Sequence, residues 1–321
     1  MSDFQRWIAA VLNAAADSFE LQPASADASF RSYYRVLIDG RSLVAMDASA
    51  ERASCTPFVN IARLLAGGEV NVPAIIAENL DAGWLLLSDL GCQTYLDVLN
   101  TDNADELFDA AIGALIAQQH IAAPPTFPQY DAALLRRELE LFPEWYLQRH
   151  LGLTIDAALR VQLDTIFDTL IGQVLKQSRV LVHRDFMPRN LMLSEPLPGV
   201  LDFQDAVVGP ISYDAICLFK DAFISWPEAR VERWLKNYWQ RAREAQLPVP
   251  NSFADFYADC DYMGAQRHLK VIGIFARICH RDGKPKYVGD VPRFFNYLHG
   301  VCERRPELSA LAALLEKISA L

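Results

Sequence analysis

The sequence lacks any run of apolar residues long enough to cross a membrane. A membrane-spanning helix needs roughly 20 such residues, and the apolar N-terminal stretch at residues 7–16 is interrupted by Asn13. This stretch also lacks the basic leading region that is typical of a signal peptide. Its larger apolar side chains fall on one helical face. We therefore expect a short amphipathic helix here and no membrane partner.

Paired cysteines and an excess of positive charge are absent as well. The six cysteines are scattered without a C-x-x-C pair, which argues against a zinc site and, in a chain of 321 residues, against a disulfide framework. We expect reduced, mostly buried thiols in a cytoplasmic protein. Thirty Lys and Arg against forty Asp and Glu give a net charge of −10. Nucleic acid, which needs a basic surface, is not an expected partner.

The first ninety residues are rich in β-prone segments. Asp39-Gly40 is a turn dipeptide between two such segments, and Thr56 is the expected N-cap of a helix with apolar residues at helical spacing. The expected elements are a hairpin, a helix and two further strands, at residues 30–47, 56–66, 72–79 and 83–91.

From about residue 94 the pattern becomes mainly helical. Two short strands joined by a loop are expected within residues 179–186 and 197–206. A chain that is 52% hydrophobic and 22% charged is globular, and its length suits two lobes. The sequence therefore predicts an α+β protein with a small β-rich N-lobe (1–90) and a large α-rich C-lobe (91–321).

The strongest motif is His183-Arg184-Asp185, followed by Asn190 and then by Asp202. It matches the kinase spacing H-R-D-x-x-x-x-N with a later metal-binding Asp. In phosphoryl transfer one carboxylate accepts the proton of the attacking hydroxyl, the role expected of Asp185. Side-chain oxygens hold Mg2+ on the phosphates of ATP, the role expected of Asn190 and Asp202. A lone H-R-D could be a surface loop, but the order and separation of all three parts favour catalysis.

Two further segments resemble the aminoglycoside phosphotransferase/choline kinase branch of the protein-kinase-like superfamily. "WLLLSDLG" resembles the hinge whose backbone binds adenine, and "ISYDAICLF" resembles a helix whose Asp, here Asp214, anchors the catalytic loop. The resemblance implies a bilobal protein-kinase-like fold in which the N-lobe (1–90) binds nucleotide and the C-lobe (91–321) carries the catalytic loop and binds the acceptor. It also implies adenine binding at Ser88, Asp89 and Leu90. We expect His183 to hold the loop through a backbone hydrogen bond and not to act as a base.

Within this branch, residues 27–36, 201–214 and 266–294 are similar to bacterial cell-wall amino-sugar kinases. Those enzymes phosphorylate the anomeric hydroxyl of N-acetylmuramate and N-acetylglucosamine in peptidoglycan recycling, which implies a small-molecule amino sugar as acceptor. An aminoglycoside or amino-alcohol kinase remains the alternative within the fold. A protein kinase is disfavoured, because Met187 stands where those enzymes place a Lys and no activation segment follows Asp202.

The phosphate-binding parts of the N-lobe are missing. Residues 27–32 stand where a G-x-G-x-x-G loop is expected, residues 44–47 contain no Lys, and residues 56–66 contain no Glu to pair with one. Either Arg31 or Arg35 supplies the phosphate-binding cation, or the protein is a nucleotide-binding pseudokinase that acts as a regulator.

Candidate acceptor contacts are aromatic, acidic and basic side chains of the C-lobe. Trp145 and Tyr213 could stack on a sugar ring or belong to the core. Asp205 could orient the acceptor or cap a helix. A basic cluster could bind an anionic acceptor, chiefly through Arg267 and Lys270, or form a solvated helix face. The cluster consists of Gln266, Arg267, His268, Lys270, Arg277, His280, Arg281, Lys284 and Lys286.

Overall fold

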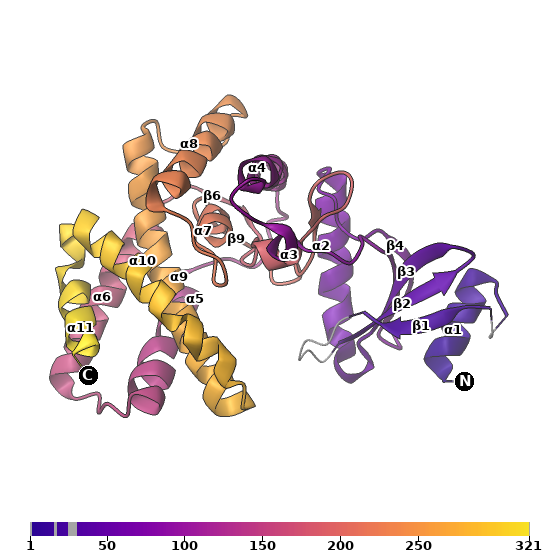
Figure 1. Ribbon diagram of the computed structural model, residues 1–321, viewed down its shortest axis with the longest axis horizontal. Coiled ribbons are helices and arrows are strands. Elements are labelled where there is room, and N and C mark those ends of the chain that lie inside the picture. The colour runs from indigo at the N-terminus through magenta and orange to yellow at the C-terminus, as the bar shows by residue number, and fades with distance from the viewer. Residues whose placement is uncertain (1, 16–17, 25–30, 321) are drawn as a thin grey trace. The chain divides into compact units, whose positions relative to one another are not determined.

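The chain folds into two compact units. A computed structural model describes residues 2–15, 18–24 and 31–320. The first unit combines Met1–Ile121 with Arg189–Ala206, and the second combines Ala122–Pro188 with Val207–Leu321. The first contains an antiparallel sheet and the second is mostly helical (Figure 1), as expected for the α+β class. The expected functional division at residue 90 stays a prediction.

The first unit is built on a five-stranded antiparallel sheet of order β1-β2-β3-β5-β4. Its strands are β1 (Glu20–Pro23), β2 (Ser32–Ile38), β3 (Arg41–Asp47), β4 (Ile75–Asn79) and β5 (Trp84–Ser88). The expected hairpin is confirmed, since β2 pairs with β3 and Ile38 lies opposite Arg41. Asp39 and Gly40 both have positive φ, 48° and 71°, as a two-residue hairpin turn requires.

Helix α1 (Asp3–Leu12) covers one face of this sheet. Phe4 and Ile8 pack on Val36, Ala45 and Leu86, which share one face because side chains alternate along each strand. The helix begins at Asp3 and not near residue 7, because Ser2 and Gln5 form a capping box. The expected start was therefore wrong, although the amphipathic character is confirmed.

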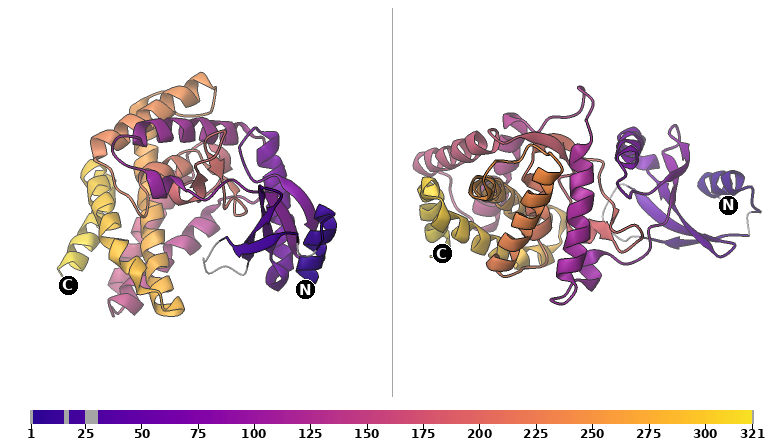
Figure 2. Two further views of the ribbon diagram at one scale, coloured as in Figure 1. Left: turned by 45° about the vertical axis from the view of Figure 1, so that its right-hand side comes forward. Right: turned by 90° about the horizontal axis from the view of Figure 1, so that it is seen from above.

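Helix α2 (Cys55–Gly67) lies on the other side of the sheet (Figure 2). Thr56 is inside this helix, and Ser54 at the N-cap makes no side-chain capping bond, so the expected Thr56 cap is wrong. The remaining elements of the unit are η1 (Ser49–Ser54), α3 (Tyr95–Val98), α4 (Ala104–His120), β7 (Leu191–Met192) and β8 (Gly199–Val200).

The second unit is organised around α9 (Phe253–Asp282), a helix of 30 residues. It packs against α5, η2, α6, α7, α8, α10 and η4. The other elements are α5 (Ala132–Leu139), the π-helix η2 (Phe142–His150), α6 (Ala157–Val174), β6 (Arg179–Val182), β9 (Val207–Pro210), α7 (Tyr213–Phe219), α8 (Glu228–Glu244), η4 (Pro285–Asp290), α10 (Val291–Arg304), η5 (Pro306–Leu308) and α11 (Ser309–Ser319).

The two short strands expected around the catalytic motif are present but do not pair with each other. β6 pairs with β9 and leads into His183. β8 pairs with β7 and leads toward Asp202. The short 3-10 helix η3 (Pro188–Asn190) lies between them in the chain. His183 and Asp202 therefore follow strands of two separate two-stranded sheets.

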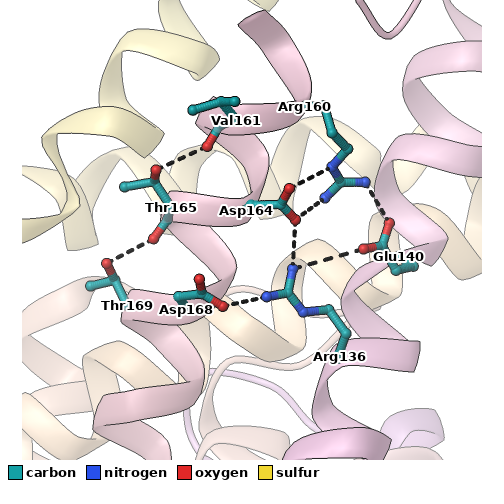
Figure 3. A network of polar contacts seen from close by, with 8 residues as sticks. All are labelled: Arg136, Glu140, Arg160, Val161, Asp164, Thr165, Asp168 and Thr169. Carbon is teal, nitrogen blue, oxygen red and sulfur yellow. Dashed lines mark hydrogen bonds and ion pairs between the residues drawn. The ribbon is translucent and has the colours of Figure 1, made fainter. Parts of the chain in front are cut away.

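A network of ion pairs fixes α5 against α6 (Figure 3). Arg136 binds Asp168 and lies 2.9 Å from Asp164, and Arg160 bridges Glu140 and Asp164 at 2.9 Å each. These side chains are between 31% and 73% exposed, so each pair stabilises the fold by less than about 1 kcal/mol.

Two expectations drawn from composition can be compared with the structure. Cys55, Cys217 and Cys260 are buried, as expected, whereas Cys92 is exposed. Within the described residues, no helix combines the length and the apolarity that a membrane crossing demands.

Helix α9 approaches the backbone beside η2 closely at Gly273. A Cβ atom built there would lie 2.4 Å from the carbonyl carbon of Leu141, next to η2. The backbone of Leu141 cannot rotate away from an added methyl group as a flexible side chain could. The absence of a side chain at residue 273 is therefore what lets α9 pack along η2.

We expect Gly273→Ala to lower the free energy of unfolding by about 1–3 kcal/mol, because the added methyl group forces α9 and η2 apart. Urea denaturation measures this change. The matched control is Gly172→Ala in α6, where a Cβ would meet nothing within 4 Å. That variant should gain up to about 1 kcal/mol from the better helix propensity of alanine. Equal stability of the two variants would contradict the tight contact.

Candidate active site

The catalytic loop of the second unit is anchored by Asp214. Its carboxylate accepts hydrogen bonds from the backbone N–H groups of His183, at 2.7 Å, and Arg184, at 3.0 Å. Asp214 is fully buried at the second position of α7. The Nδ1 atom of His183 accepts a bond from the backbone N–H of Asp185 at 3.2 Å. The expected anchoring role of Asp214 and the structural role of His183 are both confirmed.

Arg184 has a backbone conformation that is uncommon for a residue with a side chain. Its φ is +77°, which costs free energy and persists only where surrounding contacts hold it. The bond from its N–H to Asp214 holds the backbone, and an ion pair with Glu138 holds the guanidinium. The loop that carries Asp185 is therefore fixed from two sides.

Glu138 of α5 is the centre of a buried network behind this loop. Its carboxylate pairs with Arg184 and with the Nζ atom of Lys270, which is 3.0 Å away. It also accepts bonds from the hydroxyl of Tyr130 and from Nε2 of Gln266. Sequence reasoning missed Glu138. Glu138 lies three residues after Leu135, on the apolar face of α5. A charged residue on an apolar face was the sequence signal that could have indicated its buried role.

The charges of this network shift the pKa values of its members. Burial works to raise the pKa of Glu138, but Lys270 and Arg184 outweigh it, so that the pKa lies below its ordinary value. Burial raises the pKa of Tyr213 to about 12. Glu138 is thus an ionised, buried carboxylate shared by two cations.

The expected acceptor contacts of Arg267 and Tyr213 are not supported. Arg267 is 2% exposed and Tyr213 is 1% exposed, so the protein itself encloses both side chains. The Tyr213 hydroxyl lies 3.1 Å from Nζ of Lys270, and its ring meets that of Tyr130 edge-on. Burial lowers the pKa of Arg267, but Cys217, Tyr213 and then Asp185 raise it above its ordinary value. Arg267 and Tyr213 therefore belong to the buried interior next to the catalytic loop.

Trp145, the other aromatic candidate, is half-buried on η2, where the guanidinium of Arg149 lies 4.8 Å from its ring centroid. Elsewhere in the second unit a cavity of about 490 Å³ contains Arg293, which is bound to Asp290 and Ser225. The cavity is lined by Ser225, Trp226, Glu228, Gly289, Asp290, Arg293, Asn296 and Tyr297.

In the first unit, the structure brings Asn190 and Asp202 together. Nδ2 of Asn190 lies 3.4 Å from Oδ2 of Asp202, and the backbone N–H of Leu201 bonds to the carbonyl of Asn190 at 2.9 Å. Asp202 has φ +64°, a second strained position. Carboxylate and amide oxygens are ligands that magnesium accepts, so the pair fits a magnesium site that phosphates complete.

Asp205 is exposed, three residues beyond Asp202. The next element is strand β9, which begins at Val207. The helix-cap alternative for Asp205 is therefore wrong, because no helix begins there. Its contact with an acceptor stays a prediction.

The hinge residues Ser88 and Asp89 are held by the sheet. The hydroxyl of Ser88 accepts a bond from the backbone N–H of Ala74 at 2.8 Å. Asp89 accepts bonds from Nε of Arg35, at 2.6 Å, and from the hydroxyl of Ser42. Burial works to raise the pKa of Asp89, but the bonds from Arg35 and Ser42 lower it below its ordinary value. Arg35 is therefore committed to the hinge.

Arg31 lies immediately before β2, four residues ahead of Arg35, which makes the hinge contact. Its Nε donates to the hydroxyl of Ser54 at 3.3 Å, and its guanidinium lies 5.9 Å from the ring centroid of Phe58. Burial raises the pKa of Tyr33, Arg31 acts to lower it and Asp202 acts to raise it, so Arg31 and Asp202 act on one tyrosine. Residues 27–30 of the expected glycine-loop position lie outside the described residues.

We expect Glu138→Gln to lower the free energy of unfolding at neutral pH by about 3 kcal/mol or more, because it leaves Arg184 and Lys270 without a buried counter-charge. The folded pKa of Glu138 is depressed, so its contribution is present above its ordinary value of 4.5 and is lost as the pH falls through the lower folded value. Thermal unfolding of both proteins between neutral and acidic pH checks this.

Glu140→Gln is the matched control, because Glu140 lies two residues further on and is 38% exposed. We expect a loss below about 1 kcal/mol. A difference between wild type and Glu138→Gln that stays constant down to acidic pH would argue against an ionised Glu138.

Comparison with known proteins supports this geometry. Residues 20–254 match the family described as "Phosphotransferase enzyme family". A protein from Pseudomonas aeruginosa named N-acetylmuramate/N-acetylglucosamine kinase is 60% identical over 299 residues, which cover 93% of this chain and 88% of that protein.

Two solved structures share the fold at low sequence identity. The ADP-bound aminoglycoside phosphotransferase APH(2'')-Ib has a TM-score of 0.64 at 16% identity, over 94% of this chain and 98% of that one. Choline kinase LicA from Streptococcus pneumoniae has a TM-score of 0.61 at 13% identity, over 93% and 97%. Both belong to the branch that the sequence resembles, which confirms the expected protein-kinase-like fold.

Proposed function

Since the chain belongs to the phosphotransferase enzyme family, we propose that it is an ATP-dependent kinase for the anomeric hydroxyl of N-acetylmuramate and N-acetylglucosamine. The observation that carries the acceptor is the 60% identity, over 93% of this chain, to a protein named for both sugars. The fold alone is compatible with other small hydroxyl acceptors, since aminoglycoside and choline kinases share it.

In this proposal Asp185 is the general base. It accepts the proton of the acceptor hydroxyl as that oxygen attacks the γ-phosphoryl group of ATP. An anomeric hydroxyl is more acidic than an ordinary alcohol, so a carboxylate is an adequate base. The bonds from His183 and Arg184 to Asp214 support this role, because a positioned base reacts faster than a mobile one.

Asn190 and Asp202 would hold magnesium, which neutralises phosphate charge when bound. Their proximity and the strained backbone of Asp202 support this assignment. Ser88, Asp89 and Leu90 would bind adenine, and Arg35 would keep that segment in place through Asp89.

We assign the phosphate-binding cation to Arg31. Arg35 is committed to Asp89, whereas Arg31 acts on Tyr33 together with Asp202. An arginine so placed can take the part of the missing lysine, because guanidinium binds phosphate oxygens in pairs.

The function is tested by ADP release with N-acetylmuramate, N-acetylglucosamine, kanamycin and choline. We expect turnover with the two amino sugars and none with kanamycin or choline. Turnover with kanamycin or choline alone would move the protein to another acceptor class. Measurable ATP binding without turnover of any acceptor would favour a pseudokinase.

We expect Asp185→Asn to abolish sugar phosphorylation while ATP binding persists, because the amide cannot accept the proton but leaves the nucleotide contacts intact. Asp202→Ala should abolish turnover and also weaken magnesium-dependent ATP binding. Steady-state kinetics and calorimetric titration with ATP check both variants. Near-normal kcat in Asp185→Asn would remove the base assignment.

Arg31→Ala should raise the ATP KM and lower kcat, since a charge-assisted contact of about 1.5–3 kcal/mol is lost. Arg35→Ala is the comparison, because Arg35 is bound to Asp89 and its loss disturbs the proposed adenine-binding segment. We expect it to act on the ATP KM with less effect on kcat. If neither variant changes the kinetics, neither arginine is the phosphate-binding cation.

A further inference from the structure

Arg277 on α9 is a half-buried cation that makes no ion pair with the described residues. Its Nε atom is buried and has no hydrogen-bond partner, and we find no ion pair or ring contact of its side chain with the described residues. Two other cations of the basic cluster have acidic partners. Lys270 is bound to Glu138, and Arg281 is bound to Asp282 at 2.6 Å.

The surroundings of Arg277 leave its charge largely uncompensated. Burial lowers its pKa, and the neighbouring Arg281 lowers it further, while Asp282 and then Glu144 partly offset this. Asp282 is already held by both Nε and Nη2 of Arg281. A half-buried guanidinium in such a position is costly unless an anion completes it.

Arg277 lies on the same face of α9 as Lys270, which is next to the catalytic loop. Lys270, bound to Glu138 and Tyr213, marks the catalytic end of this face, and Asp185 is among the groups that raise the pKa of Lys270. Arg277 follows seven residues later, which is two helical turns or about 10 Å. The two side chains therefore project from the same side of the helix.

The same face of α9 packs along η2, and two contacts fix the register. Gly273 meets the backbone of Leu141, and Nε2 of His280 lies 3.1 Å from Nδ1 of His150. Arg277 lies midway between Gly273 and His280 along α9, so it faces the middle of η2. Its electrostatic interaction with Glu144 agrees with this placement.

We propose that Arg277 binds the carboxylate of an acidic amino-sugar acceptor whose anomeric hydroxyl is presented to Asp185. The inference rests on the proposed function and names the residue that recognises N-acetylmuramate by the group N-acetylglucosamine lacks. The lactyl carboxylate and the anomeric hydroxyl are carried by different carbons of one pyranose ring, so one molecule presents both. The fork of donors on a guanidinium matches a carboxylate.

The test compares the two sugars in Arg277→Gln. We expect kcat/KM for N-acetylmuramate to fall by roughly 10- to 100-fold, the effect of losing one charge-assisted contact, with kcat/KM for N-acetylglucosamine unchanged. Arg277→Lys should lose less, because it keeps the charge without the fork. The melting temperature should not fall in Arg277→Gln, since no protein partner is lost.

Arg293→Gln is the matched control. Arg293 is also a partly buried arginine of the second unit, but Asp290 and Ser225 hold it. We expect it to leave the ratio of the two kcat/KM values unchanged. An N-acetylmuramate-specific loss in Arg293→Gln but not in Arg277→Gln would overturn the proposal. Equal loss for both sugars in Arg277→Gln, with a lowered melting temperature, would show a structural role and overturn it too.

Calorimetric titration with N-acetylmuramate separates failure of this proposal from failure of the proposed function. Wild-type protein that binds the sugar tightly and loses affinity in Arg277→Gln, yet transfers no phosphate to it, would refute the kinase assignment and uphold the carboxylate site. Equal affinity in both proteins, or no binding by the wild type, would overturn the Arg277 site.

Discussion

The buried carboxylate of Glu138 is the constraint on which the second unit depends. It pairs with Arg184 from the catalytic loop and with Lys270 from α9, and it also accepts the hydroxyl of Tyr130. Each cation would be costly in this interior without it. One side chain thereby joins α5, the catalytic loop and the central helix, and it fixes the arginine that precedes Asp185.

Strained backbone marks both halves of the motif. Arg184 and Asp202 have positive φ in the two units, and neither is a glycine. Such conformations persist only where neighbouring contacts hold them. Asp214 and Glu138 hold Arg184, while bonds from Asn190 and Gln204 reach the Asp202 side chain. The rigidity that phosphoryl transfer needs is supplied by these polar contacts.

The cations of the chain have separate tasks that their spacing does not reveal. Arg35 fixes the hinge through Asp89, and Arg267 is enclosed behind the catalytic loop. Arg31 and Arg277 are the cations that we propose bind ligands. In this proposal, a kinase that lacks the usual lysine and glycine loop places positive charge at the phosphates and at the acceptor from other parts of the fold.

The sequence by itself determined the chemistry and the local elements. Asp185, Asn190 and Asp202 lie within eighteen residues of one another, so a short motif records their relation, and the hairpin around Asp39-Gly40 follows from its turn residues. The predicted starts of helices α1 and α2 were wrong. For α1, the capping box of Ser2 and Gln5 sets the start several residues before the apolar stretch. The role of Glu138 and the partners of the arginines were decided only by tertiary structure, because contacts between residues tens of positions apart leave no periodic trace in the chain.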